Sequence, residues 1–187
     1  VISKKIDRLE NSVLEMKQDS FDVMHLLMSS YIKKKYFEHY ESNQSDKIRI
    51  TVYSHRQDSD SFSQVGRYSP NLNYNGTGRP RYEINSGAIG VAWLQRQCDV
   101  QSLPDPELDW AAYSHELTSK WNMTNDEVQN LNMKSRAMRA IRIDGGRDKR
   151  TGIGVLLVET TNATISPKMR QLIEDVVTDS DEILDSV

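Results

Sequence analysis

The first 42 residues contain neither proline nor glycine, and apolar side chains recur through them at heptad spacing. This uninterrupted run predicts one long helix, because proline and glycine are the residues that most disfavour a helix interior. The heptad positions, which step alternately by four and by three, are Ile2, Ile6, Leu9, Val13, Met16, Ser20, Val23 and Leu27. The seam, imperfect only at Ser20, favours pairing with a second helix and predicts a dimerising signalling helix over residues 1–29. The alternative is an amphipathic helix that lies on its own domain.

Four later segments have the character of β-strands, and a fifth strand is expected to end near Tyr82 and Ile84. In the first segment Ile48, Ile50 and Val52 alternate with polar or aromatic side chains, which predicts one buried face. The last segment is apolar at successive positions, as expected of a central strand covered on both faces. Because the segments follow one another in close pairs, we expect an antiparallel sheet. The four segments are residues 48–54, 62–69, 135–144 and 153–160.

Further helices are indicated by helical spacing and by capping residues. Asn85-Ser86-Gly87 precedes a short helix whose predicted apolar face is Ile89, Trp93 and Leu94. Residues 99–106 follow as a connector with two prolines. The next helical region is predicted from the apolar and aromatic residues Leu108, Trp110, Ala111, Tyr113, Leu117 and Trp121.

Two cap signals complete the pattern. Thr124 is the expected cap of a second short helix, and Ser166 with Pro167 begins the last helix as N-cap and first helical residue. The fold class predicted from this order is α+β, a central antiparallel sheet flanked by helices in an α/β/α sandwich, with a long N-terminal coiled-coil-type helix.

Composition and motifs narrow the function classes. The net charge of −3, from 24 basic and 27 acidic residues, argues against a nucleic-acid partner. The chain lacks the H-E-x-x-H, C-x-x-C and G-x-S-x-G motifs, and its four histidines are scattered, so we expect no catalytic residue, no metal site and no cofactor. The single cysteine, Cys98, is expected to be a buried small apolar residue. The segment Gly76-Thr77-Gly78-Arg79 is either an anion cradle or a plain surface turn.

No apolar run in the sequence reaches the roughly 18 residues that a membrane span needs, and we expect a cytoplasmic location. The chain begins with Val1, so we expect a fragment of a longer protein. An upstream membrane anchor and a downstream output domain both remain open.

Two segments resemble the GAF domain family: YEINSGAIGVAW, at residues 82–93, and SRAMRAIRIDGGRDKRTGIGVLLVETT, at residues 135–161. The resemblance extends over about residues 30–185, and we assign residues 30–187 to a GAF-like sensor domain. It implies a GAF/PAS-like α/β/α fold with the first and last helices on one face of the sheet. It also implies a small-molecule pocket under the connecting segment on the other face, and a regulatory homodimer formed through the terminal helices.

The sequence departs from several branches of that family. The Asn-Lys-Phe-Asp-Glu signature of cyclic-nucleotide-binding members is absent, and a single cysteine does not supply the cysteine set of the methionine-sulfoxide-reducing members. Arg142 stands where many members have a proline.

The candidate ligand-binding residues are four aromatic side chains and two arginines: Trp93, Trp110, Tyr113, Trp121, Arg136 and Arg139. Tryptophan and tyrosine offer broad flat contacts with a polar tip, and arginine offers a fork for a carboxylate or phosphate. The alternative is that these residues belong to the core and its edges. The leading interpretation is a non-enzymatic sensor that binds an unknown small molecule and relays through its terminal helices. A ligand-free dimerisation scaffold of the same fold is the second.

Overall fold

The computed structural model describes residues 2–40, 47–56, 59–76, 78, 81–145 and 151–185. Its centre is a six-stranded antiparallel sheet with the strand order β3-β2-β1-β6-β5-β4. The strands are β1 (Ile48–His55), β2 (Ser61–Tyr68), β3 (Tyr82–Glu83), β4 (Gln97–Val100), β5 (Ala137–Gly145) and β6 (Thr151–Thr160). The predicted antiparallel sheet is confirmed. Strand β4 was not predicted, since the short segment Gln97–Val100 overlaps the start of the expected connector.

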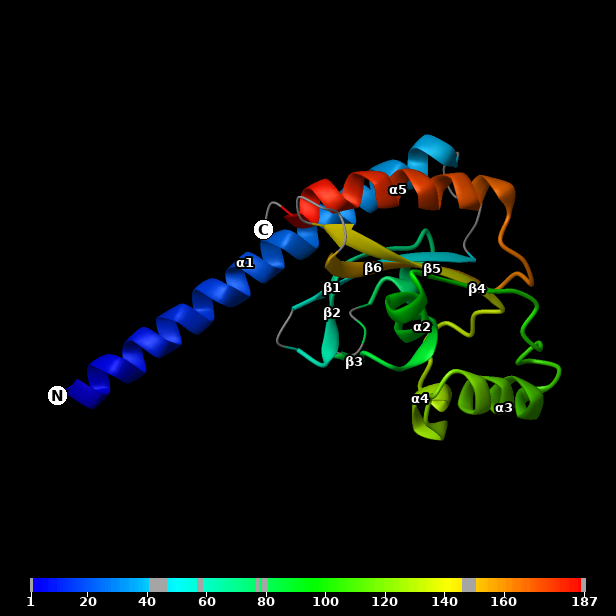
Figure 1. Cartoon of the computed structure of the whole chain (residues 1–187), viewed down its shortest axis with the longest axis horizontal. Helices are drawn as coiled ribbons and strands as arrows, with labels where there is room; N and C mark the ends of the chain where they lie inside the picture. The colour runs from blue at the N-terminus through cyan, green and yellow to red at the C-terminus, as the bar shows by residue number, and fades with distance from the viewer. Residues whose placement is uncertain are drawn as a thin grey trace.

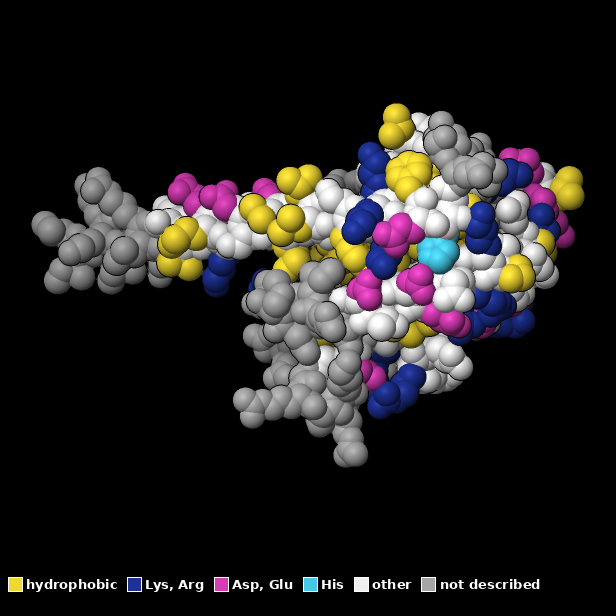
Figure 2. All heavy atoms as spheres, turned by 90° about the horizontal axis from the view of Figure 1, so that it is seen from above, with side chains coloured by type: hydrophobic (Ala, Val, Ile, Leu, Met, Phe, Trp, Pro, Cys, Tyr) yellow, Lys and Arg dark blue, Asp and Glu magenta, His cyan; other side chains and the backbone are white. Residues whose placement is uncertain are grey.

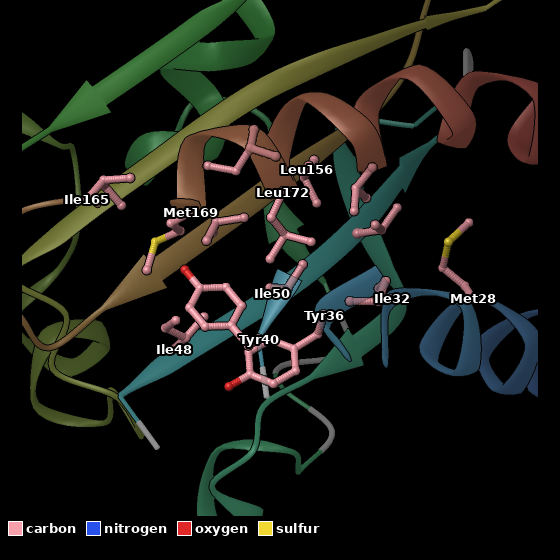
Figure 3. Packing of buried hydrophobic residues seen from close by; sticks show 14 of the residues in the cluster. Met28, Ile32, Tyr36, Tyr40, Ile48, Ile50, Leu156, Ile165, Met169 and Leu172 are labelled. Atoms are coloured by element: carbon pink, nitrogen blue, oxygen red, sulfur yellow. The ribbon is translucent and has the colours of Figure 1, made fainter. Parts of the chain in front are cut away.

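The first and last helices cover one face of this sheet, as the resemblance implied (Figure 1). They are α1 (Ile2–His39) and α5 (Pro167–Asp185). Figure 3 shows their apolar side chains meeting over β1 and β6, among them Ile32 and Tyr36 of α1 and Leu172 of α5. Glycine at position 66 of β2 permits this approach, because a Cβ atom there would lie 2.7 Å from the Cβ of Met28.

The N-terminal half of α1 projects away from the domain (Figure 1). Its described seam residues Val13, Met16, Val23 and Leu27 are 44%, 57%, 57% and 62% exposed. Apolar side chains are visible along this arm in Figure 2. The side chains of Ile2, Ile6 and Leu9 lie outside the described part of the structure.

The middle of the chain covers the opposite face of the sheet. The covering elements are α2 (Gly87–Gln95), α3 (Trp110–Lys120) and α4 (Asn125–Gln129), and the exposed 3-10 helix Leu72–Tyr74 precedes them in the chain. Ala88 and Ala92 of α2 and Leu117 of α3 pack there against Val155 and Leu157 of β6. The two terminal helices and the middle segment therefore lie on opposite sides of the sheet (Figure 1).

Local sequence explains where these helices begin. The Asp109 side chain accepts a hydrogen bond from the Ala112 amide at 2.9 Å, and Thr124 forms a reciprocal capping box with Glu127. Ser166 accepts a bond from the Met169 amide at 3.2 Å, ahead of the predicted proline at the first helical position. The capping signals of α4 and α5 are thus confirmed.

Three details of the sequence prediction were wrong. Leu94 is 73% exposed and Leu108 is 88% exposed and precedes α3, so neither belongs to a buried helix face. Strand β1 was expected to have one buried face, but Arg49 and Thr51 on its other face are also buried. The physical reason is that the middle segment covers that face and removes it from solvent.

Candidate ligand-binding site

A cavity of about 330 Å³ lies between the middle segment and the sheet face that carries Arg49, Thr51 and Tyr53. Its walls are mostly apolar and come from α2, α3, the segment after α3, and β6. The apolar and aromatic residues on these walls include Ile89, Tyr113, Leu117, Trp121, Met133 and Leu157.

The floor of the cavity contains an ion pair between adjacent strands. Arg49 of β1 and Glu159 of β6 are register partners, and two guanidinium nitrogens, Nε and Nη2, lie 2.8 and 2.7 Å from Oε2 of Glu159. The hydroxyl of Ser135 donates to the second carboxylate oxygen at 3.0 Å. Burial works against the charged guanidinium, but the adjacent Glu159 carboxylate outweighs it and raises the pKa of Arg49. This part of the floor is therefore electrically neutral.

A second buried arginine on the floor has no such counter-ion. Arg67 of β2 is 7% exposed and is the register partner of Thr51. Its Nε donates to the Thr51 hydroxyl at 3.1 Å, and its Nη1 donates to the backbone carbonyl of Gly76 at 2.6 Å. Both acceptors are neutral, and within the described ranges Arg67 forms no ion pair.

Two tyrosines and a glycine surround this guanidinium. The rings of Tyr53 and Tyr82 meet edge to face with their centroids 4.8 Å apart. A Cβ atom at Gly78 would lie 3.1 Å from Nη2 of Arg67 and in collision with the Tyr82 hydroxyl, so a side chain there would require the Tyr82 ring to move. Burial raises the pKa of Tyr53, followed by the effect of Tyr82, while the Arg67 charge acts in the opposite direction. The phenol of Tyr53 therefore stays protonated at neutral pH.

Of the segment 76–79, for which an anion cradle and a plain surface turn were the alternatives, Gly76 and Gly78 line the cavity, while Thr77 and Arg79 lie outside the described residues. The amide of Gly78 already donates to the side-chain oxygen of Gln64 at 3.2 Å, and the Gly76 carbonyl accepts from Arg67. The described backbone at this turn thus contributes an acceptor to Arg67.

Two of the six predicted site residues line the cavity. The hydroxyl of Tyr113 donates to the backbone carbonyl of Ser135 at 3.2 Å, which anchors α3 next to the start of β5. The indole Nε1–H of Trp121 is buried and has no acceptor in the described part of the chain. Trp121 therefore offers a donor beside an otherwise apolar wall.

The other four lie outside the cavity lining. Trp93 stacks near His55 at the end of β1, with a centroid distance of 4.4 Å, and the ring of Trp110 lies 5.0 Å from the Lys134 ammonium. Arg136 pairs with Asp105 and Arg139 pairs with Asp99, at 2.9 and 2.7 Å. These four residues form contacts between elements at the periphery of the sheet, and they do not converge on one site.

Sequence reasoning missed the polar residues of the floor, Arg49, Arg67 and Glu159. A charge in the middle of a strand was assigned to a solvent face, because alternation alone cannot tell whether another layer covers that face. One signal was present in the sequence: Glu159 is a carboxylate within a strand that is otherwise apolar at nearly every position. A buried carboxylate in such a strand requires a cationic or hydrogen-bonding partner.

Nucleophilic and metal chemistry have few candidate groups here. Cys98 is buried under α2, and burial together with the neighbouring Asp99 charge raises the pKa of its thiol to about 11. Across the described residues, no three His, Cys, Asp or Glu side chains gather in a group able to hold a metal ion. No helix in the described part of the chain is both long enough and apolar enough to cross a lipid bilayer.

No protein-family model matches the chain, and no curated protein matches it in sequence. Solved structures do match it over nearly its whole length. The type II free methionine-R-sulfoxide reductase of Thermoplasma acidophilum aligns with a TM-score of 0.55 at 6% identity, covering 89% of this chain and 94% of its own. The reduced form of fRMsr of Staphylococcus aureus aligns at 0.54 and 11% identity, with 91% and 94% covered.

GAF domains give comparable matches. The GAF domain of the Acinetobacter phosphoenolpyruvate-protein phosphotransferase aligns with a TM-score of 0.53 at 10% identity, covering 94% of this chain and 92% of its own. The corresponding domain from Coxiella burnetii aligns at 0.54 and 11% identity. Identities this low show the fold and leave activity undecided. The antiparallel sheet with α1 and α5 on one face and a cavity on the other thus has the GAF domain fold.

Proposed function

We propose that this chain is a regulatory sensor domain, which binds a small molecule in the cavity and passes the binding event to its terminal helices. The observation that carries the proposal is the cavity of about 330 Å³, which lies on the face of the sheet opposite α1 and α5. Its volume falls at the lower end of the range of about 300–1,000 Å³ that is usual for small-molecule sites. Apolar walls with a few buried polar groups are also usual for such sites.

Strand β2 supplies a physical connection between the cavity and α1. The Arg67 side chain lines the cavity, while its backbone amide donates to the hydroxyl of Ser29 in α1 at 3.1 Å. One residue earlier, Gly66 is in close contact with Met28 of the same helix. A ligand that shifts β2 therefore acts directly on α1, whose position against α5 is the two-state element in this proposal.

In this proposal the projecting part of α1 pairs with the same helix of a second copy. The exposed residues Val13, Met16, Val23 and Leu27 continue the heptad pattern along one line of the helix. Each is too exposed to be stabilised by its own domain, and an apolar stripe at this spacing is what a two-helix coiled coil buries. Such a homodimer would connect the two sensor domains through their paired α1 helices.

The proposal assigns no enzymatic role to the chain. Cys98 is its single cysteine, it packs beneath α2, and its raised pKa leaves little thiolate at neutral pH. The similarity to the free methionine-R-sulfoxide reductases then reflects a shared fold, used here for binding.

Native mass spectrometry and thermal unfolding with a panel of neutral, cationic and anionic metabolites test the proposal. A ligand present at 100 times its dissociation constant should raise the free energy of unfolding by about 2.7 kcal/mol. Ala88→Leu narrows the cavity and should abolish that gain, whereas Ala111→Leu on the exposed side of α3 should leave it intact. If no mass adduct and no stabilisation appear, the ligand-free scaffold becomes the better account.

A further inference from the structure

Three charged side chains are buried in the described part of the chain, and all three line the cavity floor: Arg49, Arg67 and Glu159. The Arg49 and Glu159 charges cancel within one ion pair. Among the described residues, the side chain of Arg67 donates hydrogen bonds to the neutral oxygens of Thr51 and Gly76 and forms no ion pair. The buried wall of the cavity therefore contains one positive charge without a counter-ion among the described residues, and such a charge is costly to bury unless an anion accompanies it.

The hydrogen bonds of Arg67 leave one of its nitrogens available. Nε and Nη1 are used by Thr51 and Gly76, while Nη2 has no partner in the described ranges and lies beside Gly78 at the cavity wall. These two bonds use two of the five guanidinium N–H groups, so the two N–H groups of Nη2 can be donated to an occupant of the cavity. The hydroxyl of Tyr53, on the same face of the sheet, forms no hydrogen bond with a described residue and is a second donor.

We propose that the cavity binds a small organic monocarboxylate, with its carboxylate on Nη2 of Arg67 and its apolar body between α3 and β6; this inference rests on the proposed function of the cavity. The apolar body fits the wall formed by Tyr113, Leu117 and Leu157. The cavity has the volume of roughly ten water molecules, which limits the occupant to a small compound. A single negative charge matches the single uncompensated positive charge.

The acidic side chains of the lining argue against a more highly charged occupant such as a phosphate. Glu83 and Asp126 also line the cavity but are exposed, so they lie toward its rim rather than its floor. Glu127 accepts the Thr124 amide in the capping box at 2.8 Å and is held at the N-terminus of α4. A ligand with a second negative charge would meet these carboxylates, whereas a monocarboxylate with an apolar body would not.

Pairs of an acid and its amide test whether the negative charge of the ligand determines its affinity for the cavity. Phenylacetate, indole-3-acetate and 4-methylpentanoate are each compared with the corresponding carboxamide, and phenethylamine serves as a cation of similar shape. Ligand-observed NMR titration to millimolar concentration measures the affinities. A charged hydrogen bond predicts that each acid that binds does so at least about tenfold more tightly than its amide.

Substitution then assigns the preference to one residue. Arg67→Gln should remove the acid-over-amide preference and leave amide binding within about twofold, since a neutral side chain still donates one hydrogen bond. Arg136→Gln, which removes an equal charge outside the cavity, should leave the preference unchanged. If Arg67→Gln fails to fold by circular dichroism, Arg67→Lys is used, and it should weaken acid binding while retaining a preference for the acid.

The possible outcomes separate this inference from the proposed function. If amides or the amine bind as well as the acids, or Arg67→Gln retains the preference, the monocarboxylate inference is overturned while the cavity remains a ligand site. If no acid binds the wild-type domain at millimolar concentration, the monocarboxylate inference fails, whereas the proposed function fails only if the metabolite panel also gives no mass adduct and no stabilisation.

Discussion

Arg49 and Glu159 face each other across β1 and β6, and the guanidinium Nη2 lies 2.7 Å from the carboxylate inside the domain. The pair lies at the junction of the two strands that hold the sheet together and forms the neutral half of the cavity floor. Ser135 completes the carboxylate's hydrogen bonds. Removal of either charge therefore leaves the other buried and unpaired.

Glu159→Leu should lower the free energy of unfolding by about 3–5 kcal/mol, because it leaves the Arg49 charge buried without its partner. Arg49→Met should be similarly costly, and the double variant Arg49→Met with Glu159→Leu should recover most of the loss. Urea unfolding of the four proteins measures this cycle. If the losses of unfolding free energy in the two single variants simply add in the double variant, the pair does not act as a unit.

The α1 seam makes a position-specific prediction about assembly. Met16→Asp should weaken the dimer by at least about tenfold, since a charge replaces an apolar side chain at a seam position. Leu14→Asp is the matched control, because Leu14 is 62% exposed against 57% for Met16 but lies off the seam. Sedimentation equilibrium should show dissociation for the first variant alone. Equal behaviour of the two variants would remove the basis for a coiled coil.

The contact between α1 and α5 should weaken in acid. Hydrogen bonds from Lys35, at 2.9 Å, and from Tyr31, at 2.8 Å, lower the pKa of Asp179. A carboxyl group whose pKa is lower in the folded state than in the unfolded state, where it is about 3.9, stabilises the fold at pH values above the unfolded-state pKa. This contribution to stability is lost as the pH falls through the folded-state pKa.

Asp179→Asn should consequently flatten the dependence of the urea midpoint on pH below about pH 5, compared with the wild type. Glu174→Gln is the control, since it removes a carboxylate of the same helix that forms no ion pair with any described residue. A pH profile of Asp179→Asn that coincides with the wild-type profile would contradict the assignment.

Gly66 of β2 should tolerate no side chain while Met28 occupies its present position. A Cβ atom at residue 66 would lie 2.7 Å from the Met28 Cβ, so Gly66→Ala should cost about 1–3 kcal/mol of stability by forcing α1 away from the sheet. Gly76→Ala, where an added Cβ meets no atom, is the control for the loss of glycine itself. Thermal unfolding compares the two, and a fully stable Gly66→Ala would mean that α1 moves without cost.

Local patterns in the sequence predicted most of the secondary structure. The proline-free heptad run became α1, the alternation at residues 48–54 became β1, and the capping residues Thr124 and Ser166 stand at the starts of α4 and α5. These features depend on contacts within a few residues, and such contacts are visible in the order of side chains. Strand β4 was not predicted, because a strand of four residues is too short to show a clear alternation of apolar and polar side chains.

The candidate site was predicted only in part, and Tyr113 and Trp121 are the two chosen residues that line the cavity. Trp93 and Arg139 were selected for their chemistry, yet their positions depend on packing with His55 and Asp99, which are distant in the sequence. Whether a residue reaches the cavity depends on which face of which strand it occupies. That relation becomes apparent only when the strands are in register.

The sequence by itself determined the elements and their order, because helix and strand propensity, capping and apolar periodicity are properties of neighbouring residues. Only the tertiary structure decided that the second face of β1 is buried, and so that Arg49 and Arg67 belong to an interior. Burial depends on a layer contributed by residues 81–134, far along the chain from β1. The charge of the cavity therefore arises from long-range packing, which gives a strand arginine a low-dielectric environment that its own neighbours do not encode.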